Sequence, residues 1–404
     1  MTAALDMGTT TGGAPGSVGT GALELRVVRD IGEIDAAEWD SLLAPDDLLL
    51  THRYLTVCQE SGVENARYWY LMFYRAERLA ATAVLSRMVV SLDLLSTGFT
   101  RKAILAIRKL LPGFMKIPTL FCGVPVSHGY PSIRFRDNVD PEPILERLAI
   151  EMEAIAAEQG IRLLCLKEFF PEDTNRADGL LHLGFFRGRS LPFSLMPVTW
   201  RNHEEYLGSL RSGYRRQVHW AENRLQSNGI RLEVLGDYRD HLDEIFTLYE
   251  QVMDNAPFQL ERLNREYFRL LPELMPEETA AIIATGDRGL EAALIVLLSP
   301  ARTTSHFAGI RYETQKETCA YVCLLQELIR LAIERRSEQI DFGQNSYYLK
   351  GRLGAGTEPL FIYLRYRNRV MHALLSLISP LLFPDTEVPS LRVFCAEPED
   401  HHDD

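Results

Sequence analysis

The sequence predicts an α/β fold of the α+β type, with two tandem units that each hold a mixed, mostly antiparallel sheet flanked by helices. Two observations indicate this arrangement. The chain has 404 residues, which is more than one hydrophobic core usually organises. The order helix, antiparallel strands, helix, strand occurs once in each half, which favours two similar units. We expect a first unit at residues 22–200 and a second at residues 201–384.

The first unit opens with alternating apolar residues, which are typical of a strand, and continues with helical spacing. Two β-rich runs then flank the four residues from Arg75 to Arg78, which is the pattern of a hairpin. In chain order we expect a strand at 23–28, a helix at 34–43, strands at 68–74 and 79–85, a helix at 141–158, a strand at 161–167 and an extended pair at 185–200.

The second unit shows the same order of patterns, without a visible repeat of residues. Apolar side chains at helical spacing predict the long helix at 320–333. The other expected elements are helices at 240–253 and 265–271 and strands at 279–285, 290–298, 303–310 and 339–343.

Composition and the chain ends narrow the class of protein. Residues 1–21 are rich in Gly, Thr and Ala, and we expect them to be disordered. The tail at 385–404 carries seven carboxylates against one arginine, so it supplies six of the twelve net negative charges. The remaining body is only mildly acidic, which leaves room for a local basic groove.

The cysteines and the longest apolar run indicate in which compartment of the cell the protein is found. Six scattered cysteines lack the spacing of a disulfide framework or of a tetrahedral metal site, so we expect reduced thiols and no metal. The apolar run at 370–384 is too short to span a bilayer. A cytoplasmic protein is therefore expected.

The segment at 341–354 has the most distinctive composition. It places titratable, aromatic and cationic side chains around glycines, directly after the long apolar helix and a short strand. Since α/β sheets tend to bind ligands where strands open into polar residues, we expect a site here.

Two stretches carry a family likeness. Residues 206–230 contain Arg211, Arg215 and Arg216 on a predicted helix followed by a glycine and a strand. Residues 325–354 contain a long helix, Asp-Phe-Gly at 341–343, and Lys350 before a glycine. Together they resemble the Fem-like branch of the GNAT acyltransferase superfamily, over about residues 200–370. The resemblance implies two GNAT-like domains and transfer of an acyl or aminoacyl group to an amine.

One segment departs from that pattern. Typical GNAT members hold the coenzyme A pyrophosphate on a glycine-rich loop at a helix start. The corresponding residues 311–318 contain no glycine; Thr314 and Glu317 instead match a capping box, and Arg311 and Lys316 are candidate cations for a donor phosphate. The donor therefore stays open between acyl-CoA, a carrier-protein thioester and aminoacyl-tRNA, which some Fem-like members use.

Five residues are candidates for the chemistry. Lys350 would stabilise an oxyanion or hold a donor phosphate, unless it is a surface lysine. Asp341 would orient Lys350 or accept a proton, or it would cap the following turn. If the chain is extended there, one phenol of Tyr347 and Tyr348 would face inward and return a proton to the leaving group. His306 would act as a base toward the acceptor amine, or it would be a satisfied core histidine.

A second set is assigned to substrate or donor binding. Its cations lie mostly on the predicted helix around 211–224, where they would bind phosphate or carboxylate or simply form a solvated face. The set comprises Arg211, Arg215, Arg216, Arg311, Lys316, Asn345 and Arg352.

Two apolar helices complete the predictions. Residues 101–112 form a basic amphipathic pattern, and residues 371–383 form a second apolar helix. Both are typical of peripheral membrane contact, of an entry for a long acyl chain, or of docking on the core or on a second subunit.

Three functions follow as hypotheses. The first is an N-acyltransferase that moves an acyl group from a thioester donor to a small-molecule amine. The second is an amide-forming transferase that uses aminoacyl-tRNA. The third is a non-catalytic GNAT-like module for binding or membrane recruitment.

Overall fold

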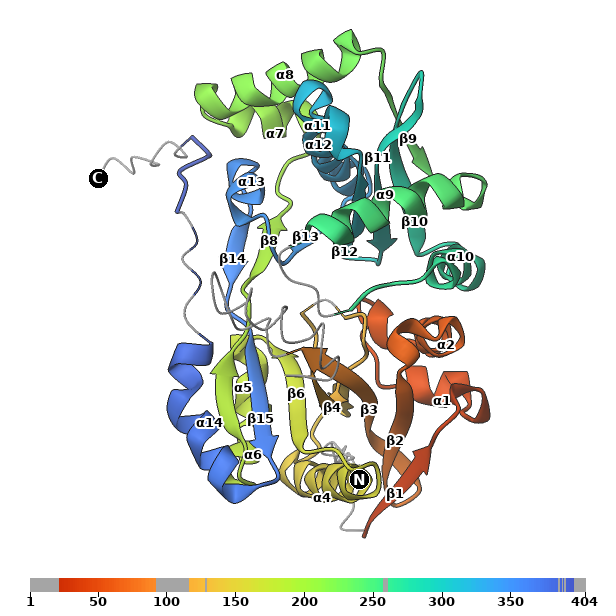
Figure 1. Cartoon of the computed structure of the whole chain (residues 1–404), viewed down its shortest axis with the longest axis vertical. Coiled ribbons are helices and arrows are strands. Elements are labelled where there is room, and N and C mark those ends of the chain that lie inside the picture. The colour runs from red at the N-terminus through yellow and green to blue at the C-terminus, as the bar shows by residue number, and fades with distance from the viewer. Residues whose placement is uncertain are drawn as a thin grey trace, which may run out of the picture.

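The computed structural model describes residues 22–91, 116–127, 129–256, 261–383, 386, 388 and 390–395. Three expectations lie wholly or mainly outside these residues: the disordered segment at 1–21, the basic helix at 101–112 and the acidic tail at 385–404. The described part holds two sheets, which lie one above the other in Figure 1 with helices around each.

The first sheet has the strand order β1-β2-β3-β4-β6-β15-β7, and β5 also pairs with β3. Its strands are β1 (Leu23–Val28), β2 (Arg67–Arg75), β3 (Arg78–Ser91), β4 (Lys116–Cys122), β5 (Ile133–Phe135), β6 (Leu163–Phe169), β7 (Phe186–Arg189) and β15 (Phe361–Tyr366). Around it lie α1 (Ala36–Asp40), α2 (His52–Ser61), α4 (Glu142–Glu158), α5 (Pro171–Ala177), α6 (Gly179–His182) and α14 (Arg369–Leu382).

The second sheet has the strand order β14-β8-β13-β12-β11-β10-β9. Its strands are β8 (Phe193–Pro197), β9 (Arg231–Leu235), β10 (Thr279–Gly286), β11 (Gly289–Leu298), β12 (Arg302–Ile310), β13 (Gln339–Gly343) and β14 (Gly356–Glu358). The surrounding helices are α7 (His203–Ser209), α8 (Ser212–Ser227), α9 (Leu242–Asn255), α10 (Arg265–Leu274), α11 (Tyr312–Thr318), α12 (Ala320–Glu334) and α13 (Tyr347–Arg352).

This architecture confirms the predicted fold class. Each sheet is antiparallel except for one parallel pair among its described strands, β4 with β6 and β12 with β13. The predicted hairpin is present, because Arg75 pairs with Arg78 across Ala76 and Glu77. Both turn residues have positive φ values, 48° and 60°, as a two-residue hairpin turn of the left-handed type requires.

The two sheets exchange strands across the predicted boundary at residues 200 and 201. β8 precedes that boundary but pairs with β13 and β14 in the second sheet. β15 follows it but lies between β6 and β7 in the first sheet, where Figure 1 shows it in blue. Residues 185–200 are extended as expected, yet β7 and β8 enter different sheets because each finds its partners in a different unit.

One of the large hydrophobic clusters is shared by the two units, while each sheet also packs on a separate cluster of its own. α2 of the first unit packs on α10 of the second, and buried side chains from both belong to one cluster. α4 covers one face of the first sheet, and α12 buries Leu324, Leu328 and Ile329 against the second. Burial of this apolar surface stabilises the junction and holds the two sheets in a defined relation.

The parallel pair in the second sheet is short. β12 and β13 pair only from Arg302 to Thr304 and from Gln339 to Asp341, and the strands part beyond these residues. Beyond these residues, β12 and β13 no longer pair with each other, and no other described strand lies between them. This parting determines where a ligand can enter the sheet.

Candidate functional site

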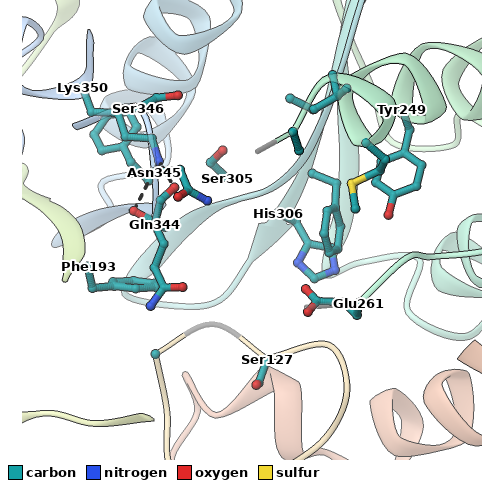
Figure 2. A pocket seen from close by; sticks show the side chains of 18 of the residues that line it. Ser127, Phe193, Tyr249, Glu261, Ser305, His306, Gln344, Asn345, Ser346 and Lys350 are labelled. Carbon is teal, nitrogen blue, oxygen red and sulfur yellow. Dashed lines mark hydrogen bonds between the residues drawn. The ribbon is translucent and has the colours of Figure 1, made fainter. Parts of the chain in front are cut away.

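A cavity of about 280 Å³ lies where β12 and β13 part. The second unit contributes Ser305–Ala308 of β12 and the residues that follow β13, while the first unit contributes Ser127, Gly129, Lys167 and Glu168. Figure 2 shows these groups converging from opposite sides, with Ser127 below and Gln344–Ser346 above. The cavity is therefore built by both units.

Lys350 lies in the wall of this cavity on the short helix α13. Its side chain is buried, and Nζ donates to the carbonyl oxygen of Gln344 at 2.7 Å and to that of Gly343 at 3.3 Å. Burial lowers the pKa of Lys350 to about 7, and the negative charge of Asp341 acts against this shift. Near neutral pH this ammonium can therefore lose its proton.

Asp341 is fully buried in β13 and is absent from the lining of this cavity. Its Oδ1 accepts a hydrogen bond from the Gly343 amide at 2.9 Å, and its Oδ2 has no hydrogen-bond partner among the described residues. Burial raises the pKa of this carboxyl to about 7, while the Gly343 hydrogen bond and the charges of Arg302 and Lys350 oppose the rise. Asp341 thus acts on the cavity through its charge.

His306 lies on β12 and lines the cavity. Its imidazole is 4% exposed, and Nε2 lies 2.7 Å from the hydroxyl of Tyr267. The register of β12 against β11 shifts between Ile295 and Val296, a bulge that changes the alternation of side chains along the strand. In Figure 2 the imidazole points toward the carboxylate of Glu261.

Charged residues from outside the predicted set also line the cavity. Lys167 and Glu168 follow one another at the end of β6, and their charged atoms lie 3.7 Å apart. Glu168 has a positive φ of 71°, and its buried Oε2 has no hydrogen-bond partner in the part of the chain that the structure describes. Such backbone strain often marks a functional site. Desolvation raises the pKa of Glu261 to about 7, helped by Glu168 and opposed by Lys167.

Gly123 makes room for one of these side chains. A Cβ atom at Gly123 would lie 2.7 Å from Cε and 3.0 Å from Cγ of Lys167. Any larger residue would therefore displace the lysine. The sequence analysis missed Lys167 and Glu168; two charged residues at the end of a predicted buried strand are the signal that could have indicated them.

The structure separates the two tyrosines from the cavity. The chain is helical at Tyr347 and Tyr348, so the expectation of an extended segment was wrong. Tyr347 donates its hydroxyl hydrogen to the carbonyl oxygen of Pro192, and Tyr348 is 57% exposed beneath the guanidinium of Arg352. Of the polar residues before them, Asn345 does line the cavity.

The arginines of the second set also lie elsewhere. Arg211 donates to the carbonyl oxygen of Phe394, Arg215 donates to carbonyls at the end of α7, and Arg216 is exposed. Arg352 hydrogen-bonds Gln217, so these cations gather around α8 and α13. None of them lines the cavity.

The segment at 311–318 forms helix α11, and Thr314 lies inside it. The predicted capping box is therefore absent; the Thr314 hydroxyl instead donates to Glu291. Arg311 donates to the carbonyl oxygen of Leu290 at 2.7 Å, and Lys316 is exposed. At the start of α12, Thr318 accepts the Ala320 amide hydrogen and Gln315 accepts that of Tyr321. Two amides that a phosphate would need are thus occupied.

The described residues hold neither a cluster of metal-ligating side chains nor a membrane-spanning helix. No group of three or more His, Cys, Asp or Glu side chains in the described part is arranged to hold a metal ion. No helix within the described ranges is long and apolar enough to cross a membrane.

Comparison with known proteins gives a family and a fold. Residues 30–345 match the FemAB-like family, described as peptidoglycan biosynthesis/recognition. FemX is similar in structure, with a TM-score of 0.55 and 12% identity over 87% of this chain and 100% of that chain. A tandem GNAT protein from the clavulanic acid biosynthesis pathway is also similar in structure, with a TM-score of 0.51 and 11% identity over 86% of this chain and 99% of that chain. At these identities the likeness concerns the fold, and it confirms the predicted tandem GNAT-like architecture.

Two curated relatives come from Mycobacterium tuberculosis strains CDC 1551/Oshkosh and ATCC 25618/H37Rv. Both bear the name "Putative 8-amino-7-oxononanoate synthase 2" and are 26% identical to this chain over 333 residues. The match covers 80% of this chain and 43% of each relative. The chain thus spans less than half the length of the curated relatives that it matches.

Proposed function

This chain belongs to the FemAB-like family, and from that premise we propose that it forms an amide by moving an acyl or aminoacyl group to a primary amine. The observation that carries the proposal is the position of Lys350, whose ammonium lies in the wall of a cavity between the two units. Three other acidic or basic groups line the same cavity: Lys167 and Glu168 of the first unit and Glu261 of the second.

The proposed reaction needs no covalent enzyme intermediate. The amine nitrogen attacks the carbonyl carbon of the donor ester or thioester, and the carbonyl oxygen gains negative charge. Protonated Lys350 stabilises that charge, as a fixed cation in a site with little water does efficiently. The C–O or C–S bond then breaks. The proton lost by the nitrogen passes to His306 and from there to the leaving oxygen or sulfur.

The two carboxylates support an amine as the acceptor. Glu168 keeps one buried oxygen without a partner, and Glu261 lies within electrostatic reach of it. A buried carboxylate oxygen is costly unless it is hydrogen-bonded, so an ammonium donor would satisfy it. The acceptor would enter as a cation and give its extra proton to one of these two carboxylates before the neutral nitrogen attacks.

The start of α12 favours aminoacyl-tRNA as the donor. In typical GNAT enzymes the corresponding amides bind the coenzyme A pyrophosphate, and here Thr318 and Gln315 occupy two of them. Arg311 is likewise engaged with Leu290 and Glu291. A donor whose phosphates lie outside this helix start fits these contacts better.

A comparison of donors tests the proposal. The purified chain would be incubated with mixed aminoacyl-tRNA or with acetyl- and palmitoyl-coenzyme A, each with a lysine-containing stem peptide and a set of simple primary amines. Mass spectrometry of the products should find a new amide with aminoacyl-tRNA, at a rate that falls with added salt. Amide formation with coenzyme A thioesters alone would overturn the donor assignment, and no amide with either donor would overturn the proposed function.

The exposed helix α14 favours a second candidate, recruitment to a membrane surface. Val370 is 81% exposed and Leu377 is 79% exposed on this helix. Such apolar exposure is unusual for a folded monomer. Flotation with anionic phospholipid vesicles tests it: the chain should float, and the double variant Val370→Glu, Leu377→Glu should not. A chain that fails to float would exclude this candidate.

A further inference from the structure

A second cavity lies at the other end of the parallel strand pair from the cavity that holds Lys350, which is called the reaction cavity below. This outer cavity has a volume of about 670 Å³, and its lining includes Arg302 and Gln339, the first residues of β12 and β13. Tyr130 and Arg134 line it from the first unit. None of its described lining residues belongs to the reaction cavity, so the two spaces are separate.

A much smaller inner pocket of about 20 Å³ adjoins the outer cavity. Five described residues line both spaces: Asp46, Asp47, Tyr130, Arg134 and Arg302. The inner pocket also reaches Asp341, which does not line the outer cavity. A space of this size holds about one water molecule or another group of similar size. A ligand in the outer cavity can therefore extend one small group to Asp341.

The carboxyl group of Asp341 leaves the inner pocket with a polar atom that is not satisfied. Asp341 is fully buried, and its Oδ2 has no hydrogen-bond partner among the residues that the structure describes. Burying a polar atom without a partner is costly, whether or not the carboxyl group is protonated. The neighbouring Asp47, by contrast, accepts two hydrogen bonds from Arg134, at 2.6 and 2.8 Å. Asp46 accepts one from the hydroxyl of Ser299 at 2.5 Å. Asp341 is thus the group in this pocket to which a ligand would bind.

The charges around both spaces favour a cation. The guanidinium of Arg302 lies over the ring of Tyr130, 4.7 Å from its centre, and Arg134 is paired with Asp47. These two arginines are outnumbered in the described lining by six carboxyl groups, those of Asp46, Asp47, Glu172, Asp173, Asp341 and Glu358. A concave space with an excess of negative charge attracts positively charged ligands.

The size of the inner pocket selects a primary ammonium. An ammonium group is compact and carries three hydrogen-bond donors, whereas a planar guanidinium is too large for about 20 Å³. A metal ion is not supported, since no three His, Cys, Asp or Glu side chains in the described ranges are arranged to hold one. The outer cavity offers apolar walls for an alkyl chain, formed by Tyr130, Pro131, Phe170, Leu195 and Pro197.

We propose that the outer cavity and the inner pocket form a binding site for an aliphatic primary amine, separate from the reaction cavity. The ammonium of this ligand lies in the inner pocket and donates a hydrogen bond to Oδ2 of Asp341. Its alkyl chain lies in the outer cavity beside Phe170 and Leu195. No covalent bond forms or breaks at this site, so the assignment does not depend on the proposed amide transfer.

Titration calorimetry of the full chain with pentylamine tests this site. The measurements use the Glu168→Gln chain, because an amine that enters the reaction cavity would pair with the buried oxygen of Glu168. We expect pentylamine to bind and uncharged pentan-1-ol to bind at least about tenfold more weakly, as the loss of a hydrogen bond between charged groups implies. Adding Asp341→Asn should weaken pentylamine binding by a similar factor. Adding Asp237→Asn is the matched control and should not change it, because exposed Asp237 pairs with Arg239 elsewhere on the chain.

A substitution in the outer cavity tests the place of the alkyl chain without changing Asp341. Gly356 lines this cavity, and a Cβ atom there would meet only the carbonyl oxygen of Leu195, at 3.8 Å. There is thus room for a larger side chain, and Gly356→Leu should weaken pentylamine binding by filling part of the cavity.

Melting curves first establish which variants are folded. Binding in the wild type that disappears in Glu168→Gln would place the amine in the reaction cavity and overturn this site. Equal binding with and without Asp341→Asn would do the same. If Asp341→Asn does not fold, equal binding with and without Gly356→Leu would overturn it. A chain that forms no amide but binds pentylamine through Asp341 would keep this site and remove only the proposed function.

Discussion

Thr304 and Asp341 are the last paired residues of the parallel strands β12 and β13, and the cavity begins with the residues that follow them. Ser305 and His306 continue on one strand, and Phe342 and Gly343 continue on the other. Because neither strand has a partner on the side where they part, side chains and a ligand share that space. The position of the site is thus a consequence of the sheet.

The activity should fall as pH rises through about 7, because protonated Lys350 is the form that stabilises the oxyanion. Asp341 supports that form, since its negative charge raises the pKa of Lys350. In Asp341→Asn the falling limb of kcat/KM against pH should therefore move to lower pH. A limb that stays in place in this variant would contradict the electrostatic link between the two residues.

The stability of Asp341→Asn should depend on pH with a defined sign. Burial raises the pKa of Asp341 from 3.8 to about 7, so the folded chain binds the proton more tightly than the unfolded chain does. This tighter proton binding stabilises the folded chain fully below about pH 4, and the stabilisation is lost as pH rises through 7. Relative to the variant, the wild type should lose on the order of 4 kcal/mol over this range. Urea unfolding of both proteins at several pH values measures this loss. A difference in their free energies of unfolding that does not change with pH would contradict the raised pKa of Asp341.

Gly123→Ala should impair transfer while the chain still folds. The added methyl group would lie 2.7 Å from Cε of Lys167, and this side chain would have to leave its place beside Glu168. Activity, or binding of the amine acceptor, should drop, and the melting temperature should fall as well, because Gly123 has a positive φ of 157° that other residues rarely adopt. Gly62→Ala is the control for backbone strain, because Gly62 also has a positive φ and an added Cβ meets no atom within 4 Å; this variant and Gly208→Ala should keep the activity of the folded chain.

Gly309→Ala should destabilise the second unit. Its Cβ would lie 2.7 Å from Cβ of Leu248 and 2.9 Å from the backbone nitrogen of Tyr249, so α9 would have to move away from β12. Overpacking of this kind costs about 1–3 kcal/mol. Gly213→Ala on α8 meets no atom within 4 Å and should be neutral or slightly stabilising. Denaturant unfolding measures the free energy of unfolding of both variants. Equal values for Gly309→Ala and Gly213→Ala would contradict the close approach of α9 to β12.

Single helices and hairpins could be predicted from the sequence because the residues that determine them are close together in the chain. The hairpin at Arg75–Arg78 and the helix at Ala320–Glu334 depend on turn residues and apolar spacing within short windows. The exchange of β8 and β15 could not be predicted, since strand pairing over such separations leaves no periodic signal.

The candidate site was predictable in part for similar reasons. Lys350 was singled out by its residue type and the family pattern, and His306 by its residue type on an alternating strand; both line the cavity. One phenol of Tyr347 and Tyr348 was expected to face inward if the chain was extended, whereas Ser346 adopts a left-handed conformation that starts a helix. The unpaired oxygen of Glu168 depends on backbone strain that no sequence pattern indicates.

The rate of amide formation by Lys350→Met, compared with that of Tyr348→Phe, tests the central claim most directly. Both residues lie on α13, but Lys350 lines the cavity and Tyr348 is exposed. Circular dichroism would first establish that both variants are folded. We predict that Lys350→Met loses about 100-fold or more in kcat, as removal of an oxyanion donor usually does, while Tyr348→Phe retains wild-type turnover. Wild-type turnover in folded Lys350→Met would contradict the account.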